Sequence, residues 1–290
     1  MLKIGFIGQG FIGKNMADDF VERGYEVVRY SLDMEYFSNR EAVAECEMVF
    51  IAVPTPTTVE GFNSGALEAV LPLVGKGKIA VIKSTIIPGM TKRLQEMFPD
   101  IVVLHSPEFL RERHAVEDTR KPPRNIIGVP VENELYLTAA ELVLSVLPKS
   151  PYELICKAEE AELIKYGGNT FLALKVIYMN LIYDLAEEVG ADYSVIADAM
   201  AADSRIGGSH MQVVDSSGHD GAVAGRGAGG HCFPKDLAAL REVYEARISH
   251  DQHGVGLLRI LEEKNNALLK STGKDLDLLI DIYGEEYFSQ

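Results

Sequence analysis

Three glycines that follow the first apolar run constrain this chain more than any other feature. Lys3–Ile7 predicts a strand, and the pattern Gly8-x-Gly10-x-x-Gly13 then leads into a helical segment and a second predicted strand, Glu26–Tyr30. This order of strand, glycine turn, helix and strand is typical of a dinucleotide-binding fold. We expect Gly8 to permit a tight turn, Gly10 to let the backbone approach a pyrophosphate, and Gly13 to let the helix pack on the strand.

The residue that would read the ribose departs from the usual pattern. An acidic side chain at the end of the second strand accepts hydrogen bonds from both ribose hydroxyls and repels a 2′-phosphate. Here Ser31 stands where we expect that acid, and Asp33 lies two residues further along. Arg29 and Ser31 would instead tolerate a 2′-phosphate. The residues therefore favour NAD as the cofactor and leave NADP open.

Alternating apolar and helical segments define the fold class. Six apolar runs predict strands, at residues 3–7, 26–30, 48–53, 78–83, 101–104 and 125–129. Near-continuous Val and Ile runs suit a parallel sheet that is buried on both faces. We therefore predict an α/β protein whose residues 1–150 form a doubly wound (Rossmann) parallel sheet, with NAD(P) at the carboxyl ends of its strands.

A different organisation is expected after residue 150. Residues 157–189 contain no proline and predict one helix about 50 Å long, with a Gly167-Gly168 pair at which it would bend. We interpret residues 151–290 as a helical domain that dimerises along this helix through burial of an apolar face. That face includes Leu163, Leu172, Val176 and Met179. The glycine-rich stretch 204–236 predicts a functional loop.

Charge and cysteine usage exclude several functions. The 290 residues carry a formal net charge of −15, which disfavours nucleic-acid binding. No apolar run is long enough to span a membrane, and the first strand starts too early to leave room for a signal peptide. Cys46, Cys156 and Cys232 have no metal-ligand spacing and are odd in number, so we expect no metal and a cytoplasmic location. We expect Cys46 and Cys156 to behave as buried apolar residues.

The third cysteine lies in a segment that suggests covalent catalysis. In residues 229–236 (GGHCFPKD), Cys232 follows two glycines, and Lys235 places positive charge near it, which favours a thiolate. A thiolate attacks carbonyl carbons. On the predicted long helix, Lys165 and Asn169 are four residues apart and share one face, where they could bind an alkoxide.

A nicotinamide site and these residues together predict a four-electron oxidation of an alcohol to an acid. The alcohol is first oxidised to an aldehyde, which adds to Cys232 as a thiohemiacetal. A second hydride transfer gives a thioester. Water then hydrolyses the thioester, with a carboxylate such as Glu108 as general base.

These motifs occur in the order that is found in one enzyme family. The matching segments are residues 8–13 (GQGFIG), 53–57 (VPTPT), 83–85 (KST), 107–112 (PEFLRE), 165–169 (KYGGN), 205–207 (RIG) and 229–236 (GGHCFPKD). With them the chain resembles the UDP-glucose/GDP-mannose dehydrogenase family, the four-electron nucleotide-sugar dehydrogenases. The resemblance covers nearly the whole chain and implies a nucleotide-sugar substrate such as UDP-glucose, NAD as cofactor, and a homodimer.

The resemblance also implies a role for each matched residue. The catalytic residues would be Thr85, Glu108, Lys165, Asn169, Cys232 and Asp236. Cys232 would be the nucleophile and Glu108 the base for thioester hydrolysis, while the others would handle the substrate oxygen and the water. The cofactor residues would be Gly8, Gln9, Gly10, Phe11, Ile12, Gly13, Ser31, Asp33, Val53, Pro54, Thr55, Ser84, Thr85 and Glu112. The substrate residues would be Glu108, Phe109, Leu110, Arg111, Lys165, Asn169, Arg205, Gly229 and Cys232, with Arg205 reaching a neighbour's substrate across the dimer interface.

Two further features, besides Ser31, depart from the family pattern. The chain ends before the family's usual carboxy-terminal nucleotide-binding domain, so we expect a short form. The loop between Arg205 and Cys232 is longer than in many members and resembles that of short or phage-type members. His210, His219 and Arg226 are candidates for diphosphate contacts in this loop.

Two other functions stay open at this point. β-Hydroxyacid dehydrogenases related to 6-phosphogluconate dehydrogenase share the glycine turn, the long helix and a Lys-x-x-x-Asn pair, but they transfer one hydride and need no cysteine. The second is a catalytically inactive dinucleotide-binding dimer, which would fit a chain without the family's usual carboxy-terminal domain. The catalytic residues that the resemblance implies are nevertheless all present.

Overall fold

A computed structural model describes residues 2–111, 114–219 and 221–288. The chain forms two compact units. The first comprises the residues up to Pro56 together with Phe62–Lys165, and the second comprises Thr57–Gly61 and the residues from Tyr166 onward. The functional assignment of residues 1–150 to NAD(P) binding and of 151–290 to dimerisation stays a prediction.

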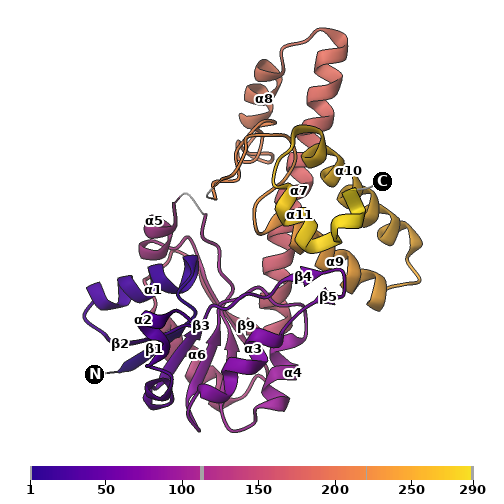
Figure 1. The fold of residues 1–290 in the computed structure, drawn as a ribbon. Coiled ribbons are helices and arrows are strands. Elements are labelled where there is room, and N and C mark those ends of the chain that lie inside the picture. Colours follow the sequence, from indigo (N-terminus) through magenta and orange to yellow (C-terminus); the bar gives the residue numbers. More distant parts are fainter. Residues whose placement is uncertain (1, 112–113, 220, 289–290) are drawn as a thin grey trace. The chain divides into compact units, whose positions relative to one another are not determined.

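The first unit is built on a seven-stranded sheet with the order β2-β1-β3-β6-β7-β8-β9, and helices pack around this sheet (Figure 1). Its strands are β1 (Lys3–Ile7), β2 (Glu26–Tyr30), β3 (Met48–Ile51), β6 (Ile79–Ile82), β7 (Val102–His105), β8 (Asn125–Val129) and β9 (Glu153–Lys157). The first five are parallel, whereas β8 runs antiparallel to β7 and β9 runs parallel to β8. The predicted α/β class with a parallel sheet is confirmed, since the sheet is mostly parallel. The sequence did not reveal that β8 runs against β7.

Helices cover both faces of this sheet, because successive apolar side chains of each strand point to opposite faces. Phe6 and Phe50 point into one cluster, with Phe20 of α1 (Phe11–Glu22) and Val143 of α6 (Glu134–Val146). Ile51 points into the opposite cluster, with residues of α3 and α4. The other helical segments of this unit are α2 (Met34–Phe37), η1 (Glu41–Glu45), α3 (Gly65–Val70), η2 (Leu71–Leu73), α4 (Met90–Met97) and α5 (Ala115–Arg120). Burial on both faces explains why the strands read as continuous apolar runs.

The chain order places a switch point at the carboxyl ends of β1 and β3. Strand β1 lies between β2 and β3, so the connections after β1 and after β2 lead to opposite sides of it. Ligands of open α/β sheets bind in the crevice outside the strands at such a point. The glycine turn at residues 8–13 follows β1 directly and therefore lies at this position.

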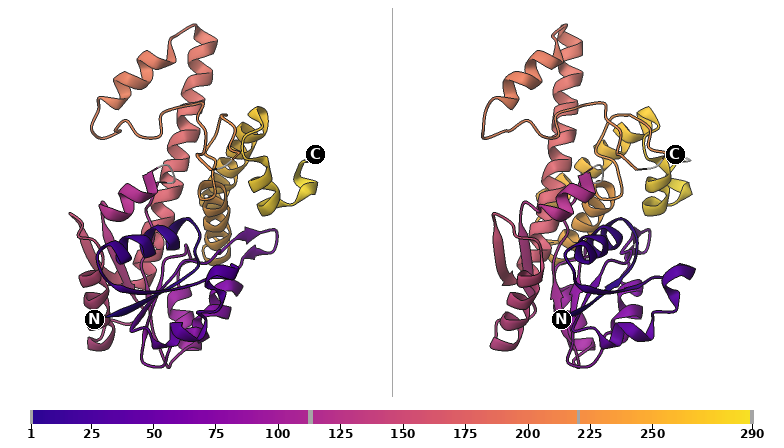
Figure 2. Two further views of the ribbon diagram at one scale, coloured as in Figure 1. Left: turned by 60° about the vertical axis from the view of Figure 1, so that its left-hand side comes forward. Right: turned by 90° about the vertical axis from the view of Figure 1, so that its left-hand side faces the viewer.

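Helix α7 (Ala158–Val189) is 32 residues long and follows β9 directly. Figure 2 shows it as one long, uninterrupted helix in both views, and it continues through Gly167 and Gly168. The predicted helix at 157–189 is confirmed. Strand β9 was not expected from the sequence, because its five residues show neither a long apolar run nor strict alternation.

The second unit is mostly helical. Its further elements are β4 (Thr57–Thr58), α8 (Tyr193–Ala201), α9 (Phe233–Arg247), α10 (Gln252–Thr272), α11 (Leu276–Tyr283) and η4 (Glu285–Phe288). Strand β4 pairs with β5 (Gly61–Phe62) in a small hairpin, and β4 packs against α9 and α11. The hairpin was not predicted, because two-residue strands carry no periodic signal.

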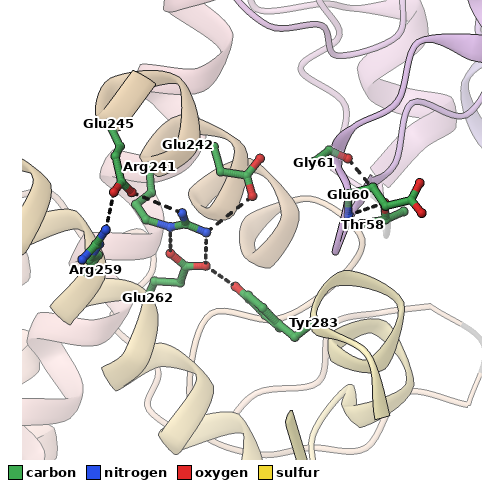
Figure 3. Close-up of polar contacts among 9 residues, drawn as sticks. All are labelled: Thr58, Glu60, Gly61, Arg241, Glu242, Glu245, Arg259, Glu262 and Tyr283. Carbon is green, nitrogen blue, oxygen red and sulfur yellow. Dashed lines mark hydrogen bonds and ion pairs between the residues drawn. The ribbon is translucent and has the colours of Figure 1, made fainter. Parts of the chain in front are cut away.

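An ion-pair network ties the helices of this unit together around Arg241 (Figure 3). The Arg241 Nε lies 2.6 Å from the Glu262 Oε2, and Tyr283 donates a hydrogen bond of 2.7 Å to the same carboxylate. Glu245 joins Arg241 to Arg259 of α10. Because Glu262 is only 6% exposed, this network connects α9, α10 and α11 beneath the surface.

The apolar face of α7 differs in part from the expected one. Val176 and Met179 are buried, and Val176 packs in the core of its own unit against Ala173 and Ala228, so they are not available for pairing between chains. A different stripe is 38% to 65% exposed and recurs every three or four residues: Phe171, Leu174, Tyr178, Leu181 and Leu185. Within residues 2–111, 114–219 and 221–288, no helix combines the length and apolar character needed to cross a bilayer.

Candidate functional site

The glycine turn has a geometry that other residues would not allow. Gly8 has φ +88°, and a Cβ placed on it would lie 2.3 Å from the carbonyl oxygen of Ala52. A Cβ on Gly13 would lie 1.9 Å from the carbonyl oxygen of Gly8. The first glycine therefore allows the close approach of β1 and β3, and the last allows α1 to pack on the turn.

The space beside Gly10 fits a dinucleotide diphosphate. A Cβ on Gly10 would meet no atom within 4 Å, so the turn is open at this residue. Gly10 caps α1 without a side-chain hydrogen bond, which leaves the first N–H groups of the helix for a ligand. The neighbouring Gln9 has a buried Oε1 that accepts no hydrogen bond from any described residue. Phe11 is exposed and Ile12 half-buried at the mouth of this turn.

The end of β2 brings the two predicted ribose residues together. Ser31 Oγ donates a hydrogen bond of 2.9 Å to Asp33 Oδ2, and the Asp33 amide donates one of 3.2 Å to Ser31 Oγ. The guanidinium of Arg29 lies 2.7 Å from Asp18 of α1. Arg29 already has a carboxylate partner, so Asp33 is the acceptor group that remains for the predicted ribose contact.

Hydrogen bonds join the predicted cofactor residues that follow β3 and β6. Thr55 Oγ1 donates to the carbonyl oxygen of Thr85 over 2.7 Å, and Ser84 Oγ donates to that of Val53 over 2.6 Å. These bonds hold the loops after the two strands together beside the switch point. Pro54 is exposed in the same loop. The predicted cofactor residue Glu112 lies outside the described residues.

Glu108 is held on both its carboxylate and its backbone. The carboxylate lies 3.1 Å from Lys83 Nζ and accepts hydrogen bonds from the amides of Phe109 and Leu110, at 2.7 Å and 3.1 Å. The predicted catalytic Lys165 donates to the carbonyl oxygen of Glu108 over 2.6 Å. Thus Glu108 and Lys165 lie side by side in the first unit. Arg111 instead pairs with Asp118 at 2.7 Å.

Sequence reasoning missed Lys83 as a site residue. Its side chain is 7% exposed, and its ammonium also donates to Ser106 Oγ over 3.2 Å. Burial lowers the pKa of the nearby His105 to about 3, so that imidazole stays neutral. A lysine directly after the apolar strand β6 was the available signal, because lysine is rarely buried unless it is paired.

In the second unit, Cys232 lies at the amino end of α9. It caps the helix and is exposed, and its carbonyl oxygen accepts a hydrogen bond of 2.9 Å from the amide of Asp236. Asp236 is fully buried and accepts hydrogen bonds from Asn169 Nδ2 at 2.6 Å and from Lys235 Nζ at 2.5 Å. Burial opposes a charge on Lys235, but the Asp236 carboxylate and Cys232 raise the pKa of its ammonium above the usual value.

The loop that leads to Cys232 is anchored by Asp275. A Cβ on Gly229 would lie 2.0 Å from Asp275 Oδ2, and the amide of Gly230 donates to the same oxygen over 2.7 Å. Ser217 Oγ donates to Asp275 as well, and His219 Nε2 lies 2.9 Å from its other oxygen. Gly229 therefore accommodates the protein's own carboxylate, so the space beside it is filled.

The structure also shows the contacts of three other predicted site residues of this loop, all in the second unit. Arg226 lies 2.5 Å from Asp184 and donates to Asn180 Oδ1 over 2.8 Å, so its guanidinium is bound to α7. Arg205 is 87% exposed and pairs with Asp203 at 2.5 Å. His210 has a buried Nδ1 with no hydrogen-bond partner among the described residues.

The predicted catalytic residues divide between the units. Thr85, Glu108 and Lys165 belong to the first, and Asn169, Cys232 and Asp236 belong to the second. Of the two remaining cysteines, Cys46 is buried and Cys156 is half-buried. Burial raises the pKa of each thiol to about 11, which keeps both protonated and unreactive at neutral pH.

A glycine turn at the switch point of an open α/β sheet, followed by a helical unit, defines a two-unit dinucleotide-binding protein. The model of the "UDP-glucose/GDP-mannose dehydrogenase family, NAD binding domain" matches residues 31–143, and that of the family's "central domain" matches residues 159–267. The chain belongs to this family and carries its NAD-binding domain. The glycine turn at residues 8–13 lies before the matched range, so its geometry supports a dinucleotide site independently of the family match.

Individual relatives agree with this membership. A UDP-glucose 6-dehydrogenase of Rhizobium meliloti (strain 1021) is 32% identical to this chain, and the match covers 82% of this chain and 62% of the relative. The chain spans 51% to 64% of the length of the curated proteins named UDP-glucose 6-dehydrogenase that it matches.

Solved structures show the same fold. A UDP-glucose dehydrogenase from Pyrobaculum islandicum has a TM-score of 0.76 and 28% identity, covering 91% of this chain and 68% of that one. The 3-hydroxyisobutyrate dehydrogenase of Mycobacterium tuberculosis has a TM-score of 0.70 and 19% identity, and the match covers 97% of this chain and 98% of that one. The second likeness concerns the fold alone.

Proposed function

We propose that this chain catalyses the NAD-dependent four-electron oxidation of a nucleotide sugar, such as UDP-glucose, to its uronic acid. The observation that carries the proposal is Cys232, exposed at the amino end of a helix and next to Lys235. Positive charge and a helix amino terminus both favour a thiolate. A dehydrogenase that stopped at the carbonyl would need no such nucleophile.

NAD supplies the hydride acceptor for both oxidations, and residues 8–13, Asp33 and Thr55 would hold it. In the first oxidation, Lys165 and Asn169 bind the hydroxyl oxygen of the sugar, and the alcohol becomes an aldehyde as it loses a hydride and a proton. Asp236 accepts hydrogen bonds from both Asn169 and Lys235, so it orients the amide and links it to the cysteine segment.

Cys232 then captures the aldehyde. Its sulfur forms a bond to the carbonyl carbon, and the oxygen takes a proton to give a thiohemiacetal. A second oxidation removes a hydride from that carbon and the proton from its hydroxyl, which leaves a thioester. The oxygen of this intermediate again needs donors such as the Lys165 ammonium.

Hydrolysis completes the reaction. Glu108 removes a proton from water, the hydroxide attacks the thioester carbon, and the C–S bond breaks to release the acid and the thiolate. Lys83 would keep the Glu108 carboxylate in place, because its ammonium lies 3.1 Å away and is almost fully buried. Lys83 is thus a positioning residue, whereas Glu108 acts on the water.

We also propose a homodimer and a cytoplasmic location. The exposed stripe at Phe171, Leu174, Tyr178, Leu181 and Leu185 has the spacing of a helix–helix seam, and burying it would stabilise a pair of chains. Arg205 would reach the substrate of the neighbouring chain, since its side chain is 87% exposed. Leu181→Glu should shift the chain toward a monomer in sedimentation analysis, and an unchanged mass would contradict this seam.

A spectrophotometric assay tests the activity. The full chain is mixed with UDP- and GDP-sugars and with either NAD or NADP, and NADH is counted per sugar consumed. Two NADH per sugar are expected, and Cys232→Ser should abolish the thioester step while Cys156→Ser leaves it intact. One NADH per sugar with an active Cys232→Ser variant would instead support a single-hydride dehydrogenase, and no NADH with any sugar would support an inactive dinucleotide-binding dimer.

A further inference from the structure

A cleft in the first unit extends from the proposed substrate residues to residues with no assigned role. Glu108, Phe109 and Leu110 line one part of it. The remaining wall includes residues of α1 and α5, the start of β8 with the segment before it, and the segment after α6. The side chains that matter there are Asp19, Asp118, Thr119 and Arg124.

Arg124 is a half-buried cation that has no anionic partner in the part of the chain that the structure describes. Its guanidinium lies 3.7 Å from the centre of the Phe109 ring, and within residues 2–111, 114–219 and 221–288 it has no hydrogen bond or ion pair. Burial lowers the pKa of Arg124, which means that water solvates the ion incompletely. Stacking on an aromatic ring leaves the edge of the guanidinium, with its N–H donors, available to a ligand.

The carboxylates in the same cleft are already neutralised. Asp19 lies 2.8 Å from Arg23, Asp118 pairs through two oxygens with Arg111, and Glu108 pairs with Lys83. These pairs cancel in charge, so the cleft keeps one uncompensated positive charge, that of Arg124. A guanidinium in such a position is suited to an oxyanion such as a carboxylate or a phosphate.

Thr119 supplies a second, independent feature. Its side chain is 8% exposed, and its Oγ1 is buried without a hydrogen-bond partner among the described residues. A buried hydroxyl without a partner destabilises the fold, and such groups are rare in native proteins. A ligand atom in the cleft would remove that destabilisation.

We propose that this cleft is an oxyanion-binding site, in which Arg124 and Thr119 bind a phosphate or carboxylate group of a small molecule. The ionic group would accept hydrogen bonds from the guanidinium edge and from the threonine hydroxyl. Because the cleft also contains Glu108 and Phe109, the bound group would belong to the nucleotide sugar or to its acid product; this last step rests on the proposed function.

Calorimetric titration of the full chain tests the site without turnover. Inorganic phosphate and acetate serve as separate probes, and saturating NAD keeps them out of the glycine turn. At least one probe should bind, and Arg124→Met should weaken it at least tenfold. Arg93→Met removes the same charge from the exposed surface of α4 and should change the affinity less than twofold. Absence of binding by both anions, or equal effects of the two variants, would overturn the proposal.

The two probes separate the sources of the ligand. Preference for phosphate would identify the phosphate of a nucleotide, and preference for acetate would identify the carboxylate of a sugar acid. Neither titration involves hydride transfer. Failure of this site is therefore distinguishable from failure of the dehydrogenase proposal, which the NADH count decides.

Thr119→Val distinguishes binding from a structural role. Valine has nearly the same shape but no hydroxyl, so the unliganded variant should be as stable as the parent or more stable. Affinity for the preferred anion should nevertheless fall several-fold. Loss of thermal stability with unchanged anion affinity would show that the hydroxyl serves the fold, and would remove Thr119 from the site.

Discussion

The glycine turn of the first unit and the Cys232 loop of the second are both rich in glycine, but different neighbours determine their shapes. Only glycine fits at position 13, because a Cβ there would collide with the carbonyl oxygen of Gly8, five residues away. Only glycine fits at position 229, because a Cβ there would collide with the carboxylate of Asp275, which is far along the chain. A local steric constraint is therefore visible in a short motif, whereas a loop anchored at a distance depends on the folded helices around it.

The largest expected effect comes from breaking the local constraint. Gly13→Ala would place a Cβ 1.9 Å from the backbone oxygen of Gly8, so the backbone would have to shift. We expect a loss of about 3 kcal/mol or more in the free energy of unfolding, measured with urea. Gly10→Ala is the matched control, because its Cβ would meet nothing within 4 Å. It should change stability by about 1 kcal/mol or less and should weaken NAD binding instead. Equal stability of the two variants would contradict the steric account.

The next largest expected loss of stability comes from removing the carboxylate of Asp275, which holds the Cys232 loop. Asp275→Ala removes the acceptor for Gly230, Ser217 and His219 at a site where the carboxylate is 4% exposed. We expect a loss of about 2–3 kcal/mol and faster proteolysis within residues 204–236. Asp281→Ala on the exposed face of α11 is the control. If proteolysis in the loop is unchanged, the loop does not depend on this carboxylate.

Two buried carboxylates, Glu162 in the first unit and Asp275 in the second, should contribute to stability with opposite dependence on acid. Burial opposes charge on Asp275, but hydrogen bonds from Ser217, Gly230 and His219 lower its pKa below the usual value. Its contribution is therefore present above the ordinary aspartate pKa of about 3.9 and is lost as pH falls through the folded value. Burial raises the pKa of Glu162, which caps α4, so its ionised form costs stability at neutral pH and this cost disappears as pH falls through the folded value.

Unfolding curves between pH 7 and pH 3 can resolve this difference. The stability advantage of the parent over Asp275→Asn should shrink below about pH 4, whereas its advantage over Glu162→Gln should grow as pH falls from 7. The two differences in unfolding free energy should therefore change in opposite directions as pH falls. Parallel trends for both variants would contradict the assigned directions.

The smallest effect concerns the choice of cofactor at the end of β2. Asp33→Asn keeps the hydrogen bond with Ser31 but removes the charge that disfavours a 2′-phosphate. We expect the KM for NAD to rise several-fold and the preference over NADP to shrink, about 1 kcal/mol in all. Asp100→Asn, on the exposed surface of the same unit, is the control. Unchanged cofactor preference would mean that another residue reads the ribose.

Most of the sheet was predictable because its strands are buried on both faces. Strands β1, β2 and β8 have the expected bounds, and β3, β6 and β7 differ by one or two residues at their ends. Strand β9 and the β4–β5 hairpin gave no signal, since their stability comes from pairing with elements that the local pattern does not show. The direction of β8 was also missed, because alternation and apolar content are the same in both strand orientations.

The candidate site was likewise predictable only in part. Residue types and spacing pointed to Glu108, Lys165, Asn169 and Cys232, and the fold adds a hydrogen-bonded or ionic partner to each of the first three. Lys83 and Arg124 were missed because a lysine or arginine in a sequence does not reveal whether it is buried. Arg226, expected to be available for a diphosphate, is instead bound to Asp184 and Asn180.

The sequence by itself determined the family, the glycine turn and the long helix. These features depend on local sterics and on apolar periodicity, both of which are present in a short stretch of chain. The tertiary structure alone decided which charges are paired, which face of α7 stays exposed, and which carboxylate anchors the Cys232 loop. Such decisions depend on burial and on partners far apart along the chain, where the free energy of a charged or apolar group is set by what surrounds it.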